Sequence, residues 1–286
     1  MEARAGIEPA CEDLQSSTSP LRHRASVRKR GFATQWTQSQ VLAVCIYQTK
    51  SSLRRLCIAQ LKQLCHEANV TEQNYSAMRA AMVASQLRTN NVNDPRVVAA
   101  IEAVARERFV PTERRSLAYT DLPVPLGSGR SLNVPMATAR LLTEAKLSPV
   151  DKLLIIGAAT GYAAAVAAEL VGSIIAVEED EMLLAQAQLN LAGDARVAVV
   201  AGPLAAGYQA NAPYDVILID GAVEQIDPRI IAQLADGGRL LTGIDDGGIT
   251  RLAAGHKAGD LCTLIAFADV ETVRLPGFET PKGFAF

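Results

Sequence analysis

Histidine, cysteine and tryptophan are scarce in this chain of 286 residues, which has three histidines, five cysteines and one tryptophan. Beyond residue 70 the sequence holds a single histidine, His256, and a single cysteine, Cys262, and no two cysteines have the CxxC spacing. The sequence therefore supports neither a disulfide framework nor a zinc site, and we expect no metal. A catalytic histidine is equally unsupported, and we interpret His256 as a polar loop residue.

Long apolar runs and a strong net charge are also missing. No uninterrupted apolar run reaches the ~20 residues that cross a bilayer, and the N-terminus lacks the residue order of a secretory signal. The formal net charge of −2 creates no general field for polyanions. We therefore expect no nucleic-acid or membrane partner, and a cytoplasmic location. The hydrophobic content of 49% is enough for a sizeable core.

The first 73 residues differ from the rest of the chain. Residues 1–40 are basic and polar, without a sustained period of 2 or 3.6. The run from Ala3 to Ala25 resembles the peptide obtained when a reading frame runs through a transfer-RNA gene. We therefore expect residues 1–73 to be a mis-assigned start or a disordered extension, with the natural chain beginning near Val70 or at Met78.

From residue 74 onward, helical and strand patterns alternate. Ser76 is expected to cap a helix to about Leu87, and Asp94-Pro95 to open a second helix. Buried strands are expected at 151–157, 174–180, 196–201, 214–220, 238–244 and 261–268, with helices at 136–146, 161–171, 181–191 and 228–234. This order predicts an α/β fold with a mostly parallel sheet, helices on both faces, and an antiparallel strand pair around Asp269.

The turn after the first expected strand carries the clearest ligand signal. Its sequence GAATGY, Gly157 to Tyr162, leads directly into a helix. Small residues let the backbone approach a ligand there, and helix-end N–H groups face it. Glu178 ends the next strand 21 residues after Gly157, where a carboxylate can accept hydrogen bonds from ribose hydroxyls. These features favour an adenosine-type ligand; the alternative is a tight turn with a surface glutamate.

The glycine spacing separates the possible ligands. A dinucleotide fingerprint needs glycines at offsets 0, 2 and 5, but offsets 2 and 5 carry Ala159 and Tyr162. NAD and FAD are therefore disfavoured, and a triphosphate-binding G-x-x-x-x-G-K-[ST] loop is missing. The methyltransferase pattern G-x-G-x-G fits better, with Gly157 and Gly161 kept and Ala159 in the middle.

From about Met78 to Ile244 the sequence resembles the protein-L-isoaspartate O-methyltransferases. Met78 to Pro111 matches the family's N-terminal helices and its RE.FVP turn, and Ala118 to Pro135 resembles its loop ending in TIS.P. PYDVILIDGA (213–222) and QLADGGRLL (233–241) complete the match. The resemblance implies a Rossmann-like class I fold with N-terminal capping helices. It also implies S-adenosylmethionine as cofactor and methyl transfer to the carboxylate of isoaspartyl residues in damaged proteins, as a step of repair.

Two departures from the family pattern affect the implied site. Asn133 stands where the family has its active-site serine, two residues before Pro135. Gly202-Pro203 stands where the family has Gly-Asp, whose carboxylate contacts the adenine amino group. A substrate carboxylate, with a pKa of ~3.9, is already ionised and needs no general base. We therefore expect Asn133 to supply a hydrogen-bond donor in place of the serine hydroxyl.

The resemblance and the motifs together predict a set of site residues. Residues 131–135 should present the substrate, with Ser131 and Asn133 as catalytic residues. The cofactor should contact Gly157, Ala159, Thr160, Gly161, Tyr162, Glu178, Gly202, Pro203 and Asp220. The arginine-rich segment from Arg106 to Arg115 is interpreted as a solvated face.

Two alternatives stay open for the function. One is a methyltransferase of the same fold that acts on another carboxylate or a small molecule. The other is a binding protein that keeps the cofactor pocket but has lost turnover. The main hypothesis and both alternatives predict cofactor binding, so only turnover separates the binding protein from the two kinds of enzyme. The sequence does not indicate an oligomeric state.

Overall fold

The computed structural model describes residues 74–280. The expectation of a mis-assigned or disordered segment at residues 1–73 therefore lies outside the described residues. The described chain opens with a helix over residues 74–82 that continues as a π-helical turn, η1 (Val83–Leu87), and a 3-10 turn, η2 (Arg88–Asn90). Residue 74 is already helical, so the expected cap at Ser76 is wrong: this serine lies inside the helix.

Two further helices and a hairpin precede the sheet. The helix α3 (Pro95–Ala103) begins as expected, because the Asp94 side chain accepts a hydrogen bond from the N–H of Arg96 at 2.8 Å. Two short 3-10 helices follow, η3 (Arg106–Phe109) and η4 (Thr112–Leu117). The strands β1 (Val124–Gly127) and β2 (Arg130–Leu132) then form an antiparallel hairpin, and α4 (Pro135–Ala145) follows.

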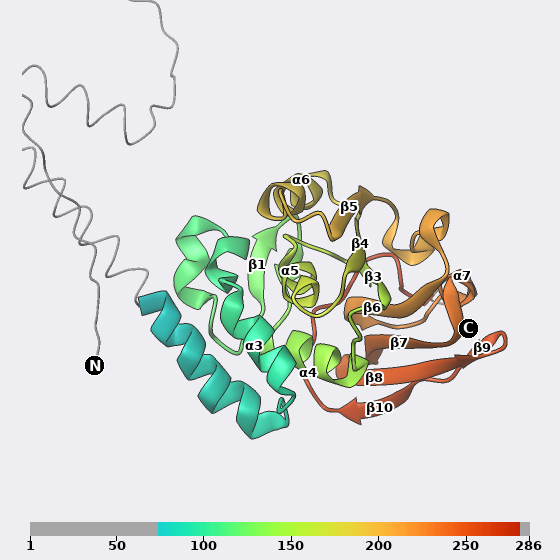
Figure 1. The fold of residues 1–286 in the computed structure, drawn as a ribbon, viewed down its shortest axis with the longest axis horizontal. Coiled ribbons are helices and arrows are strands. Elements are labelled where there is room, and N and C mark those ends of the chain that lie inside the picture. The colour runs from blue at the N-terminus through green and yellow to red at the C-terminus, as the bar shows by residue number, and fades with distance from the viewer. Residues whose placement is uncertain (1–73, 281–286) are drawn as a thin grey trace, which may run out of the picture. The chain divides into compact units, whose positions relative to one another are not determined.

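The sheet has the expected mostly parallel architecture (Figure 1). Its parallel strands are β3 (Lys152–Ile156), β4 (Ser173–Glu178), β5 (Val197–Ala201), β6 (Tyr214–Val223) and β7 (Leu234–Asp246). The strand order is β10-β8-β7-β6-β3-β4-β5, which runs from the bottom to the top of Figure 1. The connecting helices are α5 (Tyr162–Ala168), α6 (Glu181–Asn190) and α7 (Pro228–Ala232), with 3-10 turns η5 (Leu204–Ala206) and η6 (Gln209–Asn211) before β6.

The antiparallel strands at the edge of the sheet differ in part from the expectation. The strand β8 (Ile249–Ala258) pairs antiparallel with β7, and β10 (Ile265–Ala268) pairs antiparallel with β8. A short strand, β9 (Leu261–Cys262), also pairs with β8. The expected antiparallel pair is therefore present, but it is formed before Asp269, and β8 was not anticipated. His256 lies in β8 and not in a loop.

Alternation along the central strand divides the core into two layers. All four apolar residues of β3 from Leu153 to Ile156 are fully buried. Leu153 and Ile155 pack in the cluster that includes residues of α3, α4 and α5. Leu154 and Ile156 pack on the opposite face, with Ile230 of α7 and residues near the C-terminal end of the described chain. The glycine turn follows β3, and Glu178 and Asp220 lie in the carboxyl-terminal parts of β4 and β6.

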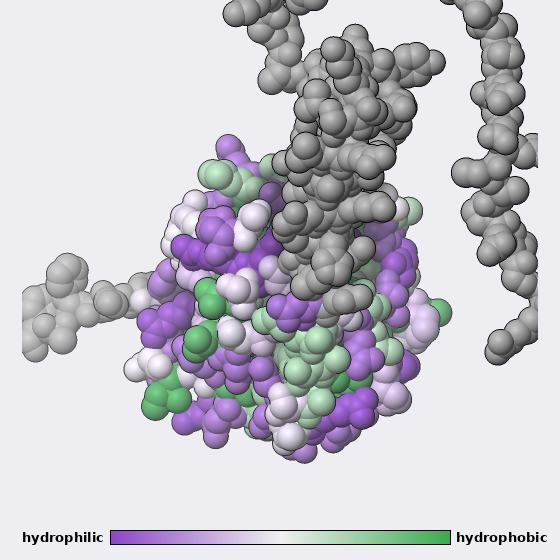
Figure 2. Space-filling view, turned by 90° about the vertical axis from the view of Figure 1, so that its left-hand side faces the viewer, coloured by the Kyte–Doolittle hydropathy of each residue, from purple (hydrophilic) through white to green (hydrophobic). Residues whose placement is uncertain are grey.

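On the face that carries the first helix, hydrophilic and hydrophobic residues are interspersed (Figure 2). Within residues 74–280, no helix combines the length and the hydrophobicity that crossing a membrane requires.

Candidate active site

The turn after β3 has the backbone conformation that its glycines predict. Gly157 and Gly161 have φ angles of +81° and +96°, in the region that favours glycine. A Cβ on Gly161 would lie 2.8 Å from a methyl group of Leu191, so a side chain at this position would displace that of Leu191. Ala159 adopts a φ of +49° as well, which costs an alanine roughly 1–2 kcal/mol. Its N–H donates a 2.7 Å hydrogen bond to Glu178, which holds the turn in place.

Glu178 is fully buried at the end of β4 and accepts five hydrogen bonds. Three come from the backbone N–H groups of Ala159, Glu179 and Asp180. The other two come from the guanidinium of Arg130, at 2.6 and 3.2 Å, one to each carboxylate oxygen. The residue that the sequence assigned to a ribose thus forms a buried ion pair with a residue of the hairpin, and sequence reasoning did not single out Arg130.

The structure joins two residues that the sequence had placed in separate motifs. Asn133 is buried in the loop between β2 and α4, and its amide nitrogen donates a 3.1 Å hydrogen bond to Asp220. The hydroxyl of Thr138 donates to the same carboxylate oxygen at 3.3 Å. The amide oxygen of Asn133 accepts hydrogen bonds from the N–H groups of Val134 and Val273, at 3.0 and 3.4 Å. These contacts fix the orientation of the amide.

Ser131 does not join this cluster. It lies half-buried on β2, opposite Pro125 of β1. Within residues 74–280 no hydrogen bond connects its hydroxyl to Asn133 or to Asp220. Of the two predicted catalytic residues, Asn133 therefore lies next to a predicted cofactor residue, whereas Ser131 lies on the hairpin that carries Arg130.

The interpretation of the arginine-rich segment as a solvated face is wrong for Arg106, whose side chain is fully buried. Its guanidinium donates to the carbonyl oxygens of Ala118, at 2.7 Å, and Asn133, and stacks 4.5 Å from the ring centroid of Tyr162. One terminal nitrogen has no hydrogen-bond partner among the described residues. Burial lowers the pKa of Arg106. The carbonyls and the aromatic face replace water around this cation, which is why it can be buried.

Burial also governs the titration of the two groups near Arg106. It raises the pKa of the Asp220 carboxyl, and the hydrogen bond from Asn133 and the positive charge of Arg106 oppose that rise. It raises the pKa of the buried Tyr162 hydroxyl as well. The Tyr162 ring meets Phe109 edge to face, with ring centroids 5.6 Å apart. Tyr162 is therefore part of the packed wall behind the turn.

Gly202 and Pro203 lie at the end of β5, beside the end of β4. The N–H of Gly202 donates to the backbone oxygen of Glu178 at 3.2 Å, and Pro203 is exposed. The carboxylate of Glu179 accepts a 3.3 Å hydrogen bond from the N–H of Leu204, the residue that follows Pro203. A carboxylate is thus present next to the position where the family's Asp is missing, although it comes from the residue that follows β4.

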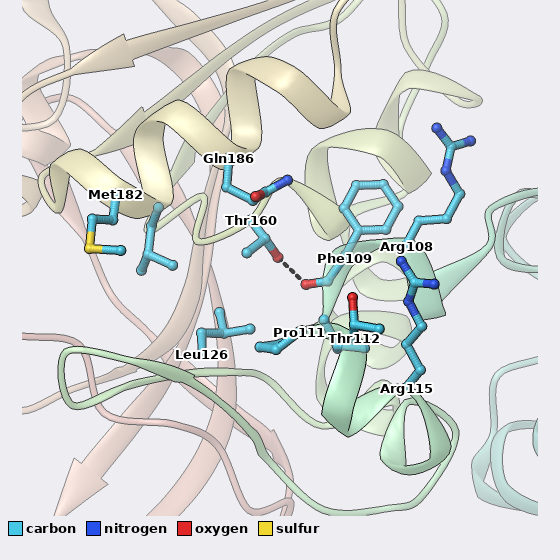
Figure 3. Close-up of a pocket in the computed structure, with 11 residues that line it drawn as sticks. Arg108, Phe109, Pro111, Thr112, Arg115, Leu126, Thr160, Met182 and Gln186 are labelled. Carbon is cyan, nitrogen blue, oxygen red and sulfur yellow. Dashed lines mark hydrogen bonds between the residues drawn. The ribbon is translucent and has the colours of Figure 1, made fainter. Parts of the chain in front are cut away.

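A cavity of about 300 Å³ lies between α6 and the segment that carries η3 and η4 (Figure 3). Thr160 lines it and donates a 2.6 Å hydrogen bond to the backbone oxygen of Phe109. Leu126 of the hairpin and the α6 residues Met182 and Gln186 contribute further walls. Thr160 is the one predicted cofactor residue in its lining, so this cavity adjoins the buried carboxylates and does not contain them.

Comparison with known proteins identifies the family. The sequence model of the protein-L-isoaspartate(D-aspartate) O-methyltransferase family matches residues 77–275. The chain belongs to this family. A family member from Herpetosiphon aurantiacus, protein-L-isoaspartate O-methyltransferase, is 36% identical over 205 residues, which cover 71% of this chain and 92% of that protein. Protein-L-isoaspartate O-methyltransferase 1 of Rhodopseudomonas palustris is 35% identical over 210 residues, 72% and 86% of the two chains.

Solved structures of the same family share the fold. One structure of a protein-L-isoaspartate O-methyltransferase aligns with a TM-score of 0.58 and 23% identity, over 64% of this chain and 62% of that chain. A Plasmodium falciparum protein described as a member of the family, in complex with S-adenosyl-L-homocysteine, aligns with a TM-score of 0.58 and 16% identity. That alignment covers 70% of this chain and 96% of the other. The expected class I methyltransferase fold is confirmed.

Proposed function

We propose that this protein is an S-adenosylmethionine-dependent protein-L-isoaspartate O-methyltransferase. It transfers a methyl group to the carboxylate of isoaspartyl residues in damaged proteins. The main support for this proposal is that three features lie together at one edge of the sheet, in a chain that belongs to this family. These features are the left-handed turn at Gly157–Gly161, the buried acceptor Glu178, and the Asn133–Asp220 pair.

The residues at the end of β4 fit an adenosine-containing cofactor. The cofactor supplies an electrophilic methyl group when it is bound. A ribose presents two neighbouring hydroxyl donors, and Glu178 presents two carboxylate oxygens that already accept a pair of parallel N–H donors from Arg130. Glu178 would hold the ribose when Arg130 moves aside. Ala159, Thr160 and Gly161 would line the methionine end, with Gly157, Tyr162 and Asp220 around them, and Gly202 and Pro203 would flank the adenine.

The Asn133 amide is suited to orient a substrate carboxylate. An amide nitrogen carries two N–H donors, and one of them bonds to Asp220. The second has no acceptor among the described residues, and we assign it to a substrate oxygen. Because the substrate carboxylate is ionised at neutral pH, the residues need to align and desolvate it and need not remove a proton. The buried cation of Arg106 lies close enough to Asp220 to offset part of the repulsion between Asp220 and an incoming carboxylate.

We propose that residues 74–286 form the methyltransferase domain and that isoaspartyl-containing proteins or peptides are its partners. A role in protein repair follows from the chemistry, because the methyl ester of an isoaspartyl residue can cyclise to a succinimide. A cytoplasmic location agrees with the single cysteine beyond residue 70.

Turnover with matched peptides tests the proposal. The full chain is supplied with S-adenosylmethionine and with two peptides that differ in one isoaspartyl or aspartyl linkage, and S-adenosylhomocysteine is measured over time. Product with the isoaspartyl peptide alone supports the proposal. Equal rates with both peptides would indicate another carboxylate substrate and would contradict it.

A second candidate is a family member that binds the cofactor without turnover. The occupation of Glu178 by Arg130 favours it, as do the strained Ala159 and the missing carboxylate at Pro203. This candidate predicts that S-adenosylhomocysteine binds, while no product forms with either peptide.

A further inference from the structure

The ion pair between Arg130 and Glu178 is the most completely buried ion pair among the described residues. The Glu178 side chain has no exposed surface, and that of Arg130 is 8% exposed. The pair joins residues 48 positions apart, and the two N–H groups of one guanidinium edge meet the two oxygens of one carboxylate. Such forked pairs combine strength with a fixed geometry.

Arg130 makes the same kind of contact that a ribose would make. Both present two adjacent donors to the two oxygens of a single carboxylate, and both need the same face of Glu178. We propose that Arg130 is an internal substitute for the ribose diol, which closes the ribose site in the empty protein and has to leave before the cofactor binds. This inference rests on the proposed function, because it assigns Glu178 to the ribose.

When the ribose replaces Arg130, Glu178 keeps its hydrogen bonds to the backbone. The N–H groups of Ala159, Glu179 and Asp180 bond to the carboxylate independently of Arg130. Two N–H donors are therefore replaced by two O–H donors, and no buried acceptor is left without a partner. The released guanidinium reaches water, where its solvation offsets part of the lost contact. The two arrangements can thus lie close enough in free energy to exchange.

The hairpin that carries Arg130 has an exposed tip. Its strands are four and three residues long, and the tip residues Gly127, Ser128 and Gly129 are exposed. A Cβ placed on either tip glycine would meet nothing within 4 Å. Val124 and Leu132 at the base of the hairpin are buried and hold it to the core. Release of Arg130 would therefore involve the exposed tip, while the base of the hairpin stays packed.

The hairpin tip also touches the turn that follows Glu178. The pKa of the Asp180 carboxyl lies below its usual value, first because the N–H of Leu183 bonds to it, with smaller contributions from Met182, Ser128 and Arg130. Asp180 caps α6 through the N–H groups of Met182 and Leu183. In the closed arrangement the hairpin thus contacts both Glu178 and the start of α6.

Calorimetric titration with S-adenosylhomocysteine tests the inference. If a closed state competes with the ligand, the apparent Kd equals the Kd of the open state divided by the fraction of protein that is open. Arg130→Ala removes the competitor, so it should bind S-adenosylhomocysteine about ten- to a hundredfold more tightly than the wild type. Arg130→Gln, which keeps much of the side-chain volume, should tighten binding in the same direction. Unchanged or weaker binding by both variants would overturn the inference.

Arg239→Ala is the matched control. It removes an ion pair with Asp151, 2.5 Å long, at the opposite ends of the strands. Its affinity for S-adenosylhomocysteine should equal that of the wild type. If neither the wild type nor any variant binds the ligand, both this inference and the proposed cofactor are overturned. Binding with equal affinity in wild type and Arg130 variants overturns the inference alone.

Thermal unfolding separates competition from a merely structural role. If Arg130 pairs with Glu178 only in the empty protein, Arg130→Ala should lower the Tm without ligand and leave the Tm at saturating S-adenosylhomocysteine close to that of the wild type. A pair that persists in the bound protein would lower both Tm values equally, and that result would overturn the inference.

Discussion

The amide of Asn133 donates a 3.1 Å hydrogen bond to the carboxylate of Asp220, across 87 positions of sequence. This contact ties the loop between β2 and α4 to the carboxyl-terminal part of β6. Both groups are buried, so breaking this bond would leave a buried donor and a buried acceptor without a partner, which costs free energy. It places the residue that replaces the family's serine against a fixed acceptor. The properties of this pair lead to the first two predictions.

Substitution of Asn133 should show how far its amide replaces a hydroxyl. Asn133→Ala removes the donor to the substrate, and the loss of one hydrogen bond to a charged group is worth roughly 1.5–3 kcal/mol, or about ten- to a hundredfold in kcat/KM. Asn133→Ser restores the family residue and should stay within about tenfold of the wild type. Steady-state kinetics with an isoaspartyl peptide measure both. Equal activity of the alanine variant and the wild type would exclude a role for the amide in turnover.

Loss of the Asp220 carboxylate should release the Asn133 amide from its fixed orientation. We expect Asp220→Asn to raise KM for the isoaspartyl peptide by about tenfold or more, because the amide then loses a charged acceptor. Thr138→Val is the control: it removes the longer 3.3 Å bond to the same carboxylate and leaves Asn133 untouched. Its effect on KM should be smaller. The opposite order of the two variants would contradict an orienting role for Asp220.

The stability of the protein should depend on pH through Asp220. Burial raises the pKa of this carboxyl above its usual 3.8, so the folded chain holds the proton more tightly than the unfolded chain. Its contribution to stability is fully present below pH 3.8 and is lost as the pH rises through the folded pKa. The variant Asp220→Asn has no titratable group at this position, so its stability does not decrease in this way as the pH rises. We therefore expect urea unfolding over a pH series to show that the free energy of unfolding of the variant, relative to that of the wild type, increases from acid to neutral pH. A difference that is constant with pH would contradict the shift.

Replacement of Arg106 should destabilise the fold. Arg106→Met leaves the carbonyls of Ala118 and Asn133 without their donor and removes the stacking on Tyr162. We expect a loss of about 3 kcal/mol in the free energy of unfolding, measured by urea denaturation. Arg108→Met is the matched control, because Arg108 is a nearby exposed arginine on the same 3-10 helix. It should change stability by less than about 0.5 kcal/mol. Similar losses in both variants would contradict the account of Arg106.

Local patterns in the sequence predicted the central part of the fold. The apolar run of β3, the glycine turn and the acidic end of β4 are each encoded within a few neighbouring residues. The strand β8 was missed although its turn was readable: Gly247 and Gly248, both with positive φ, join Asp246 to Ile249 in a two-residue hairpin loop. The polar residues of β8, such as Arg251 and His256, hid the strand, because one side of it is exposed.

The contacts within the candidate site were less predictable, because they join residues far apart in sequence. The motifs named Asn133, Asp220 and Glu178 separately, but no local pattern pairs Glu178 with Arg130. The charge run around Arg106 gave no sign of which arginine is buried, since burial depends on the carbonyls and on the Tyr162 ring that the fold brings to it. Chemistry-bearing residue types were therefore visible from sequence, whereas their partners required the structure.

Mass spectrometry of the peptide product tests the central claim most directly. The wild-type chain is incubated with S-adenosylmethionine and an isoaspartyl peptide, with the matched aspartyl peptide as control, and the peptides are analysed for a methyl ester and for the succinimide that forms from it. The account predicts the ester and the succinimide on the isoaspartyl peptide and an unmodified aspartyl peptide. An isoaspartyl peptide that stays unmodified while S-adenosylhomocysteine binds to the protein would contradict it.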